Sequence, residues 1–203
     1  FSVSKGLSTG IAALIVTLQP ILTNALAGPL LNENVTWRQW AGVLLGFFGA
    51  ILVLGFDIGS NLPITGIIAT FISLISVTAA TLWQKKISNN LPLPVSNMYQ
   101  AIGGFLFHAF VILFFEKPLI NFSATFIIAM SHQIFLVSFG AFSILMYLLH
   151  NGSASKTVTL FFLVPPTSAV MAWIFLNENL STLDIFGFSI ATAGVYIATR
   201  KKN

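Results

Sequence analysis

Residues 160–194 read LFFLVPPTSAVMAWIFLNENLSTLDIFGFSIATAG, and residues 15–49 read IVTLQPILTNALAGPLLNENVTWRQWAGVLLGFFG. Aligned without gaps, the two stretches share the block Leu-Asn-Glu-Asn, at 31–34 and 176–179, with matching leucine, proline and glycine positions around it. Each stretch is an apolar run with a proline, a polar turn with a glutamate, and a second apolar run with glycines. We therefore interpret them as two copies of one helical hairpin.

The composition indicates that both hairpins lie in lipid. Hydrophobic residues make up 56% of the 203-residue chain and charged residues 7%, whereas a soluble domain carries about 25% charge. The mean hydropathy is +0.92. With no cysteine, the chain has neither disulfides nor thiolate metal sites. We interpret the net charge of +4 as a topology signal and expect the bilayer, not a nucleic acid, as partner.

Seven apolar segments are long enough to cross a membrane, which takes about 20 residues in a helix. Helices are expected because lipid offers no partners to unpaired backbone groups. The sequence thus predicts an all-α polytopic membrane protein. The predicted spans lie near 7–31, 39–56, 64–83, 97–115, 126–149, 156–176 and 183–199.

The basic residues indicate how these spans are oriented. With the C-terminal basic tail in the cytoplasm, alternation of the spans puts seven of the nine basic residues inside. Only Lys5 and Lys117 then lie outside. The first and sixth spans are five crossings apart, so the two hairpins have opposite orientations. We expect Glu33 at the cytoplasmic side and Glu178 outside, as in the inverted repeats of secondary transporters.

The same residues carry a resemblance to a known family. Segment 6–55, with its proline, its Glu-containing turn and Gly42 to Gly49, resembles the end of an EamA-type repeat of the drug/metabolite transporter superfamily. Segment 64–199 resembles a whole repeat, although Asn32 and Asn177 stand where the family often has glycine.

This resemblance implies a ten-helix inverted-repeat transporter built from two five-helix repeats. Residues 1–57 would then hold helices four and five of the first repeat. Residues 58–203 would hold helices six to ten and a short basic tail. On this interpretation the chain is N-terminally truncated by three helices.

One candidate cavity face lies on the fourth span. Asn97, Gln100, Gly104 and His108 share one helical face, and polar stripes in lipid usually face a cavity or another helix. His108, about halfway through the span, would bind substrate or titrate; alternatively, it is a buried histidine bonded to a neighbouring helix. Proton coupling through His108 is a hypothesis.

A second candidate face lies on the first span, where Thr17 and Asn24 accompany small residues. Tyr147 and Trp173 are further candidates because aromatic rings line cavities by stacking. Interfacial anchoring or simple packing is the alternative for both aromatic residues.

Prolines and glutamates recur at equivalent places in the two hairpins. Pro20, Pro165 and Pro166 would make hinges or static kinks, since proline removes a backbone hydrogen bond. We expect Glu33 and Glu178 to cap the helix that follows each turn, with a coupling-ion role as the alternative.

Small residues form a stripe on the second span and on the last span. Gly42, Gly46 and Gly49 share one face of the second span, and Gly187 and Gly194 repeat that face on the last. Small faces let membrane helices approach closely, so we expect tight packing within the bundle or across a homodimer.

The predicted function is secondary transport of a small metabolite, amino-acid-like or similarly polar and amphipathic, by alternating access and towards export. No catalytic dyad, metal-ligand spacing or nucleotide motif is present, so we expect neither an enzyme nor a cofactor nor a metal. Phosphorylated sugars are not expected, because no basic cluster lines the spans. A truncated non-transporting fragment and a scaffold or assembly partner are the alternatives. The expected location is a bacterial inner membrane.

Overall fold

A computed structural model describes residues 2–55, 63–88, 92–115, 122–176, 179 and 181–200. Across these residues all regular structure is helical, and seven helical stretches are long and apolar enough to cross a membrane. This confirms the predicted all-α polytopic membrane protein, and each predicted span end agrees to within a few residues. The spans are Thr9–Leu31, Trp37–Leu54, Ile64–Ile87, Leu93–Phe115, Ala124–Asn151, Ala154–Phe175 and Thr182–Thr199.

The first span consists of two helices, α1 (Thr9–Val16) and α2 (Gln19–Leu31), separated by Thr17 and Leu18. Pro20 lies in the first turn of α2, where its missing N–H leaves no helical hydrogen bond unmade. The interruption therefore falls just before the proline, at the start of a new helix.

The sixth span has the same layout. It runs through α8 (Ala154–Thr159), the 3₁₀ segment η3 (Leu160–Leu163) and α9 (Val164–Leu176). Pro165 and Pro166 lie in the first turn of α9. Pro165 thus matches Pro20, and the change of helix type before it lies at the position that matches the break in the first span.

The fifth span differs from the regular helix that the sequence predicts. α6 (Ala124–His132) leads into a π-helical segment, η2 (Gln133–Ala141), and then into α7 (Phe142–Asn151). Ser138 Oγ donates to the Gln133 carbonyl, five residues back, at 3.1 Å. π-helical turns are rare and occur often at functional sites.

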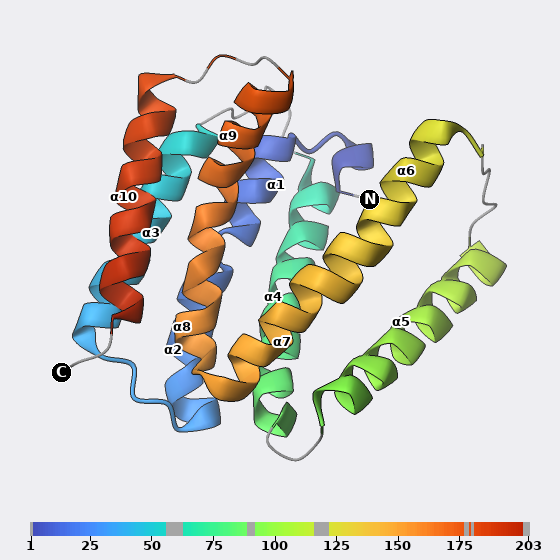
Figure 1. The fold of residues 1–203 in the computed structure, drawn as a ribbon, viewed down its shortest axis with the longest axis horizontal. Helices are drawn as coiled ribbons and strands as arrows, with labels where there is room; N and C mark the ends of the chain where they lie inside the picture. Colours follow the sequence, from blue (N-terminus) through green and yellow to red (C-terminus); the bar gives the residue numbers. More distant parts are fainter. Residues whose placement is uncertain are drawn as a thin grey trace. The chain divides into compact units, whose positions relative to one another are not determined.

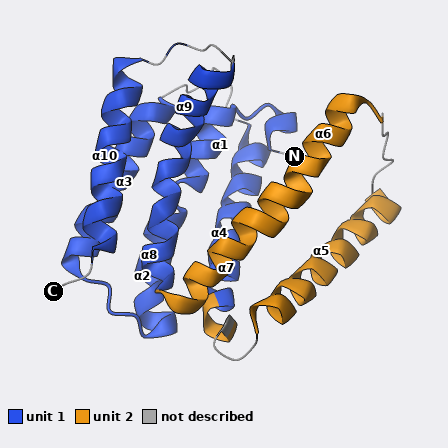
Figure 2. Cartoon of the chain, viewed as in Figure 1, with its two compact units in different colours: residues 1–84, 153–203 blue, residues 85–152 orange. Residues whose placement is uncertain are grey.

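The chain forms two compact units, coloured separately in Figure 2. One lies within residues 1–84 and 153–203, and the other within residues 85–152. In the first unit Val43, Ala50, Phe162 and Val195 form a buried apolar cluster. This unit joins the end of the predicted first repeat to the end of the second.

The most extensive contact in the first unit is between α3 (Trp37–Leu54) and α10 (Thr182–Thr199), which lie side by side (Figure 1). A Cβ added at Gly49 would lie 2.4 Å from Ala191 N, and one at Gly194 2.4 Å from Gly46 N. Both glycine stripes therefore pack against each other within the chain, because only glycine leaves room for the two backbones.

The two helices of this pair, α3 and α10, also have the same kind of N-terminal cap. Thr36 and Gln39 form a capping box at the start of α3, and Ser181 and Asp184 form one at the start of α10. Each pair satisfies N–H groups that a helix leaves open at its first turn. The cap of α3 is thus Thr36, not Glu33 as the sequence analysis expects.

In the second unit, α5 (Leu93–Phe115) lies opposite the fifth span. Most of its side chains are exposed on the surface of the described chain. One stretch of α5 nevertheless faces η2 and α7 across a cavity.

Candidate functional site

A cavity of ≈ 890 Å³ lies in the second unit, between the first turns of α5 and the junction of η2 with α7. Its size falls within the range of small-molecule sites, about 300–1,000 Å³. Both walls are membrane spans. The lining residues are Leu93, Pro94, Asn97, Met98, Gln100, Ala101, Val137, Ser138, Phe139, Phe142 and Ser143.

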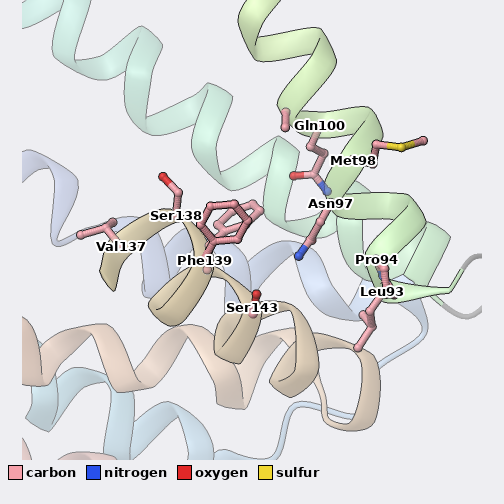
Figure 3. Close-up of a pocket in the computed structure, with 11 residues that line it drawn as sticks. Leu93, Pro94, Asn97, Met98, Gln100, Val137, Ser138, Phe139 and Ser143 are labelled. Atoms are coloured by element: carbon pink, nitrogen blue, oxygen red, sulfur yellow. The ribbon is translucent and has the colours of Figure 1, made fainter. Parts of the chain in front are cut away.

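Four of the lining side chains are polar, and none carries a charge. Asn97 and Gln100 come from α5, and Figure 3 shows them on the side facing Phe139 and Ser143 of the opposite span. The remaining seven lining residues are apolar. A mostly apolar wall with a few converging polar groups is typical of sites that bind small amphipathic molecules.

Among the polar side chains of the lining, Asn97 has a buried oxygen whose hydrogen bonding is incomplete. Its Oδ1 is buried and has no hydrogen-bond partner within the described residues. A buried acceptor without a donor costs about 1–3 kcal/mol, and because Oδ1 is covered in this structure, a ligand's N–H or O–H would reach it only after the Asn97 side chain turns. Gln100 Nε2 donates to Ser96 Oγ one turn earlier, at 3.5 Å.

The π-helical segment contributes one side of the cavity. Val137, Ser138 and Phe139 all belong to η2, and Ser143 follows in α7. Within this segment, Ser138 Oγ donates to the Gln133 carbonyl. The π-helical turn thus brings two serine residues, Ser138 and Ser143, into the lining of one cavity.

Of the polar stripe predicted on the fourth span, only one end lines the cavity. Asn97 and Gln100 lie in the wall, but His108 does not. The His108 ring is exposed, and its Nδ1 lies 2.7 Å from the Gly104 carbonyl of the same helix. His108 is therefore neither buried nor bonded to a neighbouring helix in this structure.

The other predicted cavity residues lie elsewhere. Tyr147 and Trp173 are 59% and 55% exposed and do not line the cavity. Thr17 Oγ1 donates to the Ala13 carbonyl of the preceding helix, α1, at 2.7 Å. Asn24 is 2% exposed, and its Nδ2 donates to the Pro20 carbonyl at 2.7 Å. The first span thus supplies buried polar contacts but no wall of this cavity.

Glu33 caps a helix, but the helix is α8, more than 100 residues further along the chain. Its carboxylate accepts hydrogen bonds from Ala154 N at 2.6 Å, Ser155 N at 3.1 Å and Ser155 Oγ at 2.7 Å. These N–H groups are among those that a helix start leaves unpaired. Asn24 Nδ2 also reaches the Ser155 carbonyl at 3.4 Å, and Gln39 Nε2 reaches Ser155 Oγ at 3.5 Å.

This polar cluster connects the first hairpin to the start of the sixth span. Its counterpart in the second hairpin, Glu178, lies outside the described residues. Sequence reasoning did not find Gln39 as a partner of Ser155, nor Gln19, whose Nε2 donates to Thr81 Oγ1 at 3.3 Å. Polar residues inside apolar spans were the available signal for both.

Sequence reasoning also missed the far wall of the cavity. Ser138 and Ser143 are five residues apart, which on a regular α-helix places them about 140° from each other. A π-helical turn, with hydrogen bonds five residues apart, reduces that angle. Among the described residues, no group of three His, Asp or Glu side chains is arranged to hold a metal ion.

Comparison with known proteins identifies the family. An uncharacterized transporter of Bacillus subtilis is 25% identical over 206 residues, covering 96% of this chain and 64% of that protein. A "Probable amino-acid metabolite efflux pump" of Salmonella typhimurium is 23% identical, covering 97% of this chain and 69% of the pump. A "Probable terminal-alkyne amino-acid exporter" of Streptantibioticus cattleyicolor is 22% identical, covering 95% and 64%. The names of these relatives indicate transporters, not enzymes.

The chain therefore spans about two thirds of the length of these relatives. A crystal structure with 17% sequence identity matches the fold with a TM-score of 0.77, over 95% of this chain and 67% of that chain. The EamA-like transporter family matches residues 1–55 and 64–200. Because this match covers nearly the whole chain, the protein belongs to the EamA-like transporter family, within the drug/metabolite transporter superfamily.

Proposed function

We propose that this chain belongs to a secondary transporter that exports a small amino-acid-like metabolite by alternating access. The observation that carries the proposal is the mostly apolar cavity with four polar side chains, which lies between two membrane spans in a member of a transporter family. Two relatives are named for the efflux or export of amino-acid compounds, which supports both the substrate class and the direction.

The two hairpins, if inverted, explain how the protein would alternate between its two open states. Two related units of opposite orientation exchange inward-open and outward-open shapes around a shared site. The breaks before Pro20 and Pro165 occupy matching places in the two hairpins and are the candidate hinges. A solute gradient or an ion gradient would supply the energy, since the sequence has no nucleotide-binding motif.

The proposed orientation has the C-terminus in the cytoplasm of a bacterium. Two contacts support the alternation of the spans on which this orientation rests, because each joins segments that alternation puts on the same side of the membrane. Glu33 meets Ser155, and Arg38 donates to the Arg200 carbonyl. The proposed location is the inner membrane, where the excess of basic residues on one side sets topology.

Transport by the full-length protein in liposomes tests this function. Exchange of radiolabelled leucine for internal unlabelled leucine should be at least tenfold faster than in empty liposomes. Asn97→Leu combined with Gln100→Leu should lower the initial rate about tenfold, because two polar groups of the wall are removed. Asn151→Leu, an exposed change in the same unit outside the cavity, should leave the rate unchanged.

The possible outcomes test the substrate site and the transport function separately. A normal rate in the double variant would show that this cavity is not the substrate site. If the protein exchanges no leucine and no other amphipathic amino acid, the proposed function is wrong. Cells that produce the protein should also retain less labelled solute than cells without it, since export lowers internal accumulation.

A further inference from the structure

The eleven residues that line the cavity include no Lys, Arg, His, Asp or Glu. A charged group that moves from water into this cavity meets no side chain of opposite charge in the lining. The effective penalty for an unpaired buried ion is several kcal/mol, whereas a group that finds hydrogen bonds pays far less. The lining thus disfavours solutes that carry a net positive or negative charge.

Asn97 contributes the polar contact with the clearest chemistry. Its amide offers an acceptor, Oδ1, and two N–H donors, and Oδ1 has no partner in the described chain. Once the side chain turns Oδ1 toward the cavity, the amide can accept from an N–H of a ligand and donate to an oxygen of the same ligand. Amides and the paired charges of a zwitterion both present this combination, with no net charge.

The apolar residues of the lining indicate what the rest of the ligand should be like. Leu93, Val137, Phe139 and Phe142 are apolar, and Phe139 lies opposite Gln100 in Figure 3. A solute held here buries an apolar body against these side chains, at about 25 cal/mol per Å² removed from water. The polar headgroup then lies at the α5 side, next to Asn97.

We propose that the cavity selects amphipathic solutes of zero net charge, and that Asn97 is the residue that sets this selection. This inference rests on the proposed transport function and narrows its substrate class. A solute with a headgroup of N–H and C=O groups and an apolar side chain fits the lining. Its cationic and anionic relatives do not, because each brings one unpaired charge into the site.

A charge series with a constant side chain tests the selection. Leucine is a zwitterion and N-acetyl-leucinamide is uncharged, while leucinamide is a cation and N-acetyl-leucine an anion. At pH about 6.5 the amino group of leucinamide is protonated, because an α-amino group has a pKa of about 7.7–8.0. Ligand binding raises the melting temperature, which gives the affinity of the full-length protein for each member.

Both members of zero net charge should bind at least tenfold more tightly than both charged members. Asn97→Asp should reverse the order for one pair, with leucinamide now at least tenfold tighter than in the wild type and leucine weaker. Asn151→Asp makes the same chemical change outside the cavity and should keep the wild-type order. Transport of the four compounds should follow the same order.

Two results would overturn the inference while leaving transport intact. One is a charged member that binds or is transported as well as leucine. The other is an Asn97→Asp variant with an unchanged order among the four compounds. If none of the four binds, the inference is also wrong, and a wider set of amphipathic solutes in the transport assay then decides whether the proposed function survives.

Discussion

At the scale of single residues, Glu33 makes the contact that reaches furthest along the chain. Its carboxylate takes three hydrogen bonds from Ala154 and Ser155 at the start of α8. Hydrogen bonds to a charged group contribute about 1.5–3 kcal/mol, and a lost N-cap costs about 0.5–2 kcal/mol. Glu33→Ala should therefore destabilise the protein by about 2–3 kcal/mol, seen as an apparent melting temperature about 4–12 °C lower.

Two companion variants show whether the carboxylate is responsible. Glu33→Gln keeps one acceptor oxygen and loses the charge, so its melting temperature should fall by roughly half as much. Asn34→Ala changes an exposed neighbour in the same turn and should shift stability by no more than about 0.5 kcal/mol. If Glu33→Ala melts like Asn34→Ala, the contact to α8 contributes nothing.

At the scale of elements, the pairing of α3 with α10 depends on glycine. A Cβ at Gly49 would lie 2.4 Å from Ala191 N and 2.7 Å from the Gly187 carbonyl, and backbone atoms cannot move without separating the helices. Gly49→Ala should cost about 1–3 kcal/mol by overpacking. Gly104→Ala on α5 meets nothing within 4 Å, so it should be neutral or stabilise by up to about 1 kcal/mol. Equal melting temperatures for the two variants would contradict this packing.

The elements also show what the sequence can predict and what it cannot. Spans follow from composition, and the glycine stripes follow from helical spacing, so both were predictable; so were Asn97 and Gln100, as polar residues on one face. Ser138 and Ser143 were not, because their spacing fits a π-helical turn and not an α-helix. The partner of Glu33 was not predictable either, since no local pattern indicates a contact across 121 residues.

At the scale of the whole molecule, the two hairpins are related by sequence, by capping boxes at Thr36 and Ser181, and by breaks before matching prolines. The alternating-access mechanism proposed for this chain requires that they also lie upside down relative to each other in the bilayer. Packing within the chain supports this arrangement, because α3 and α10 run antiparallel, with Gly42 against Ala198 and Gly49 against Ala191. Direct measurement of which side each turn faces is the decisive test.

Single cysteines make that measurement straightforward, because the chain has no cysteine of its own. Asn34 and Asn179 occupy matching places in the two turns, and both are exposed. In intact cells a membrane-impermeant maleimide should label Asn179→Cys, whereas Asn34→Cys should react only after the membrane is opened. Labelling of both from one side would exclude inverted hairpins and, with them, the alternating-access mechanism. Labelling in the reversed order would keep the inverted repeat and place the C-terminus outside, because each span that separates the turns from the basic tail changes the side once.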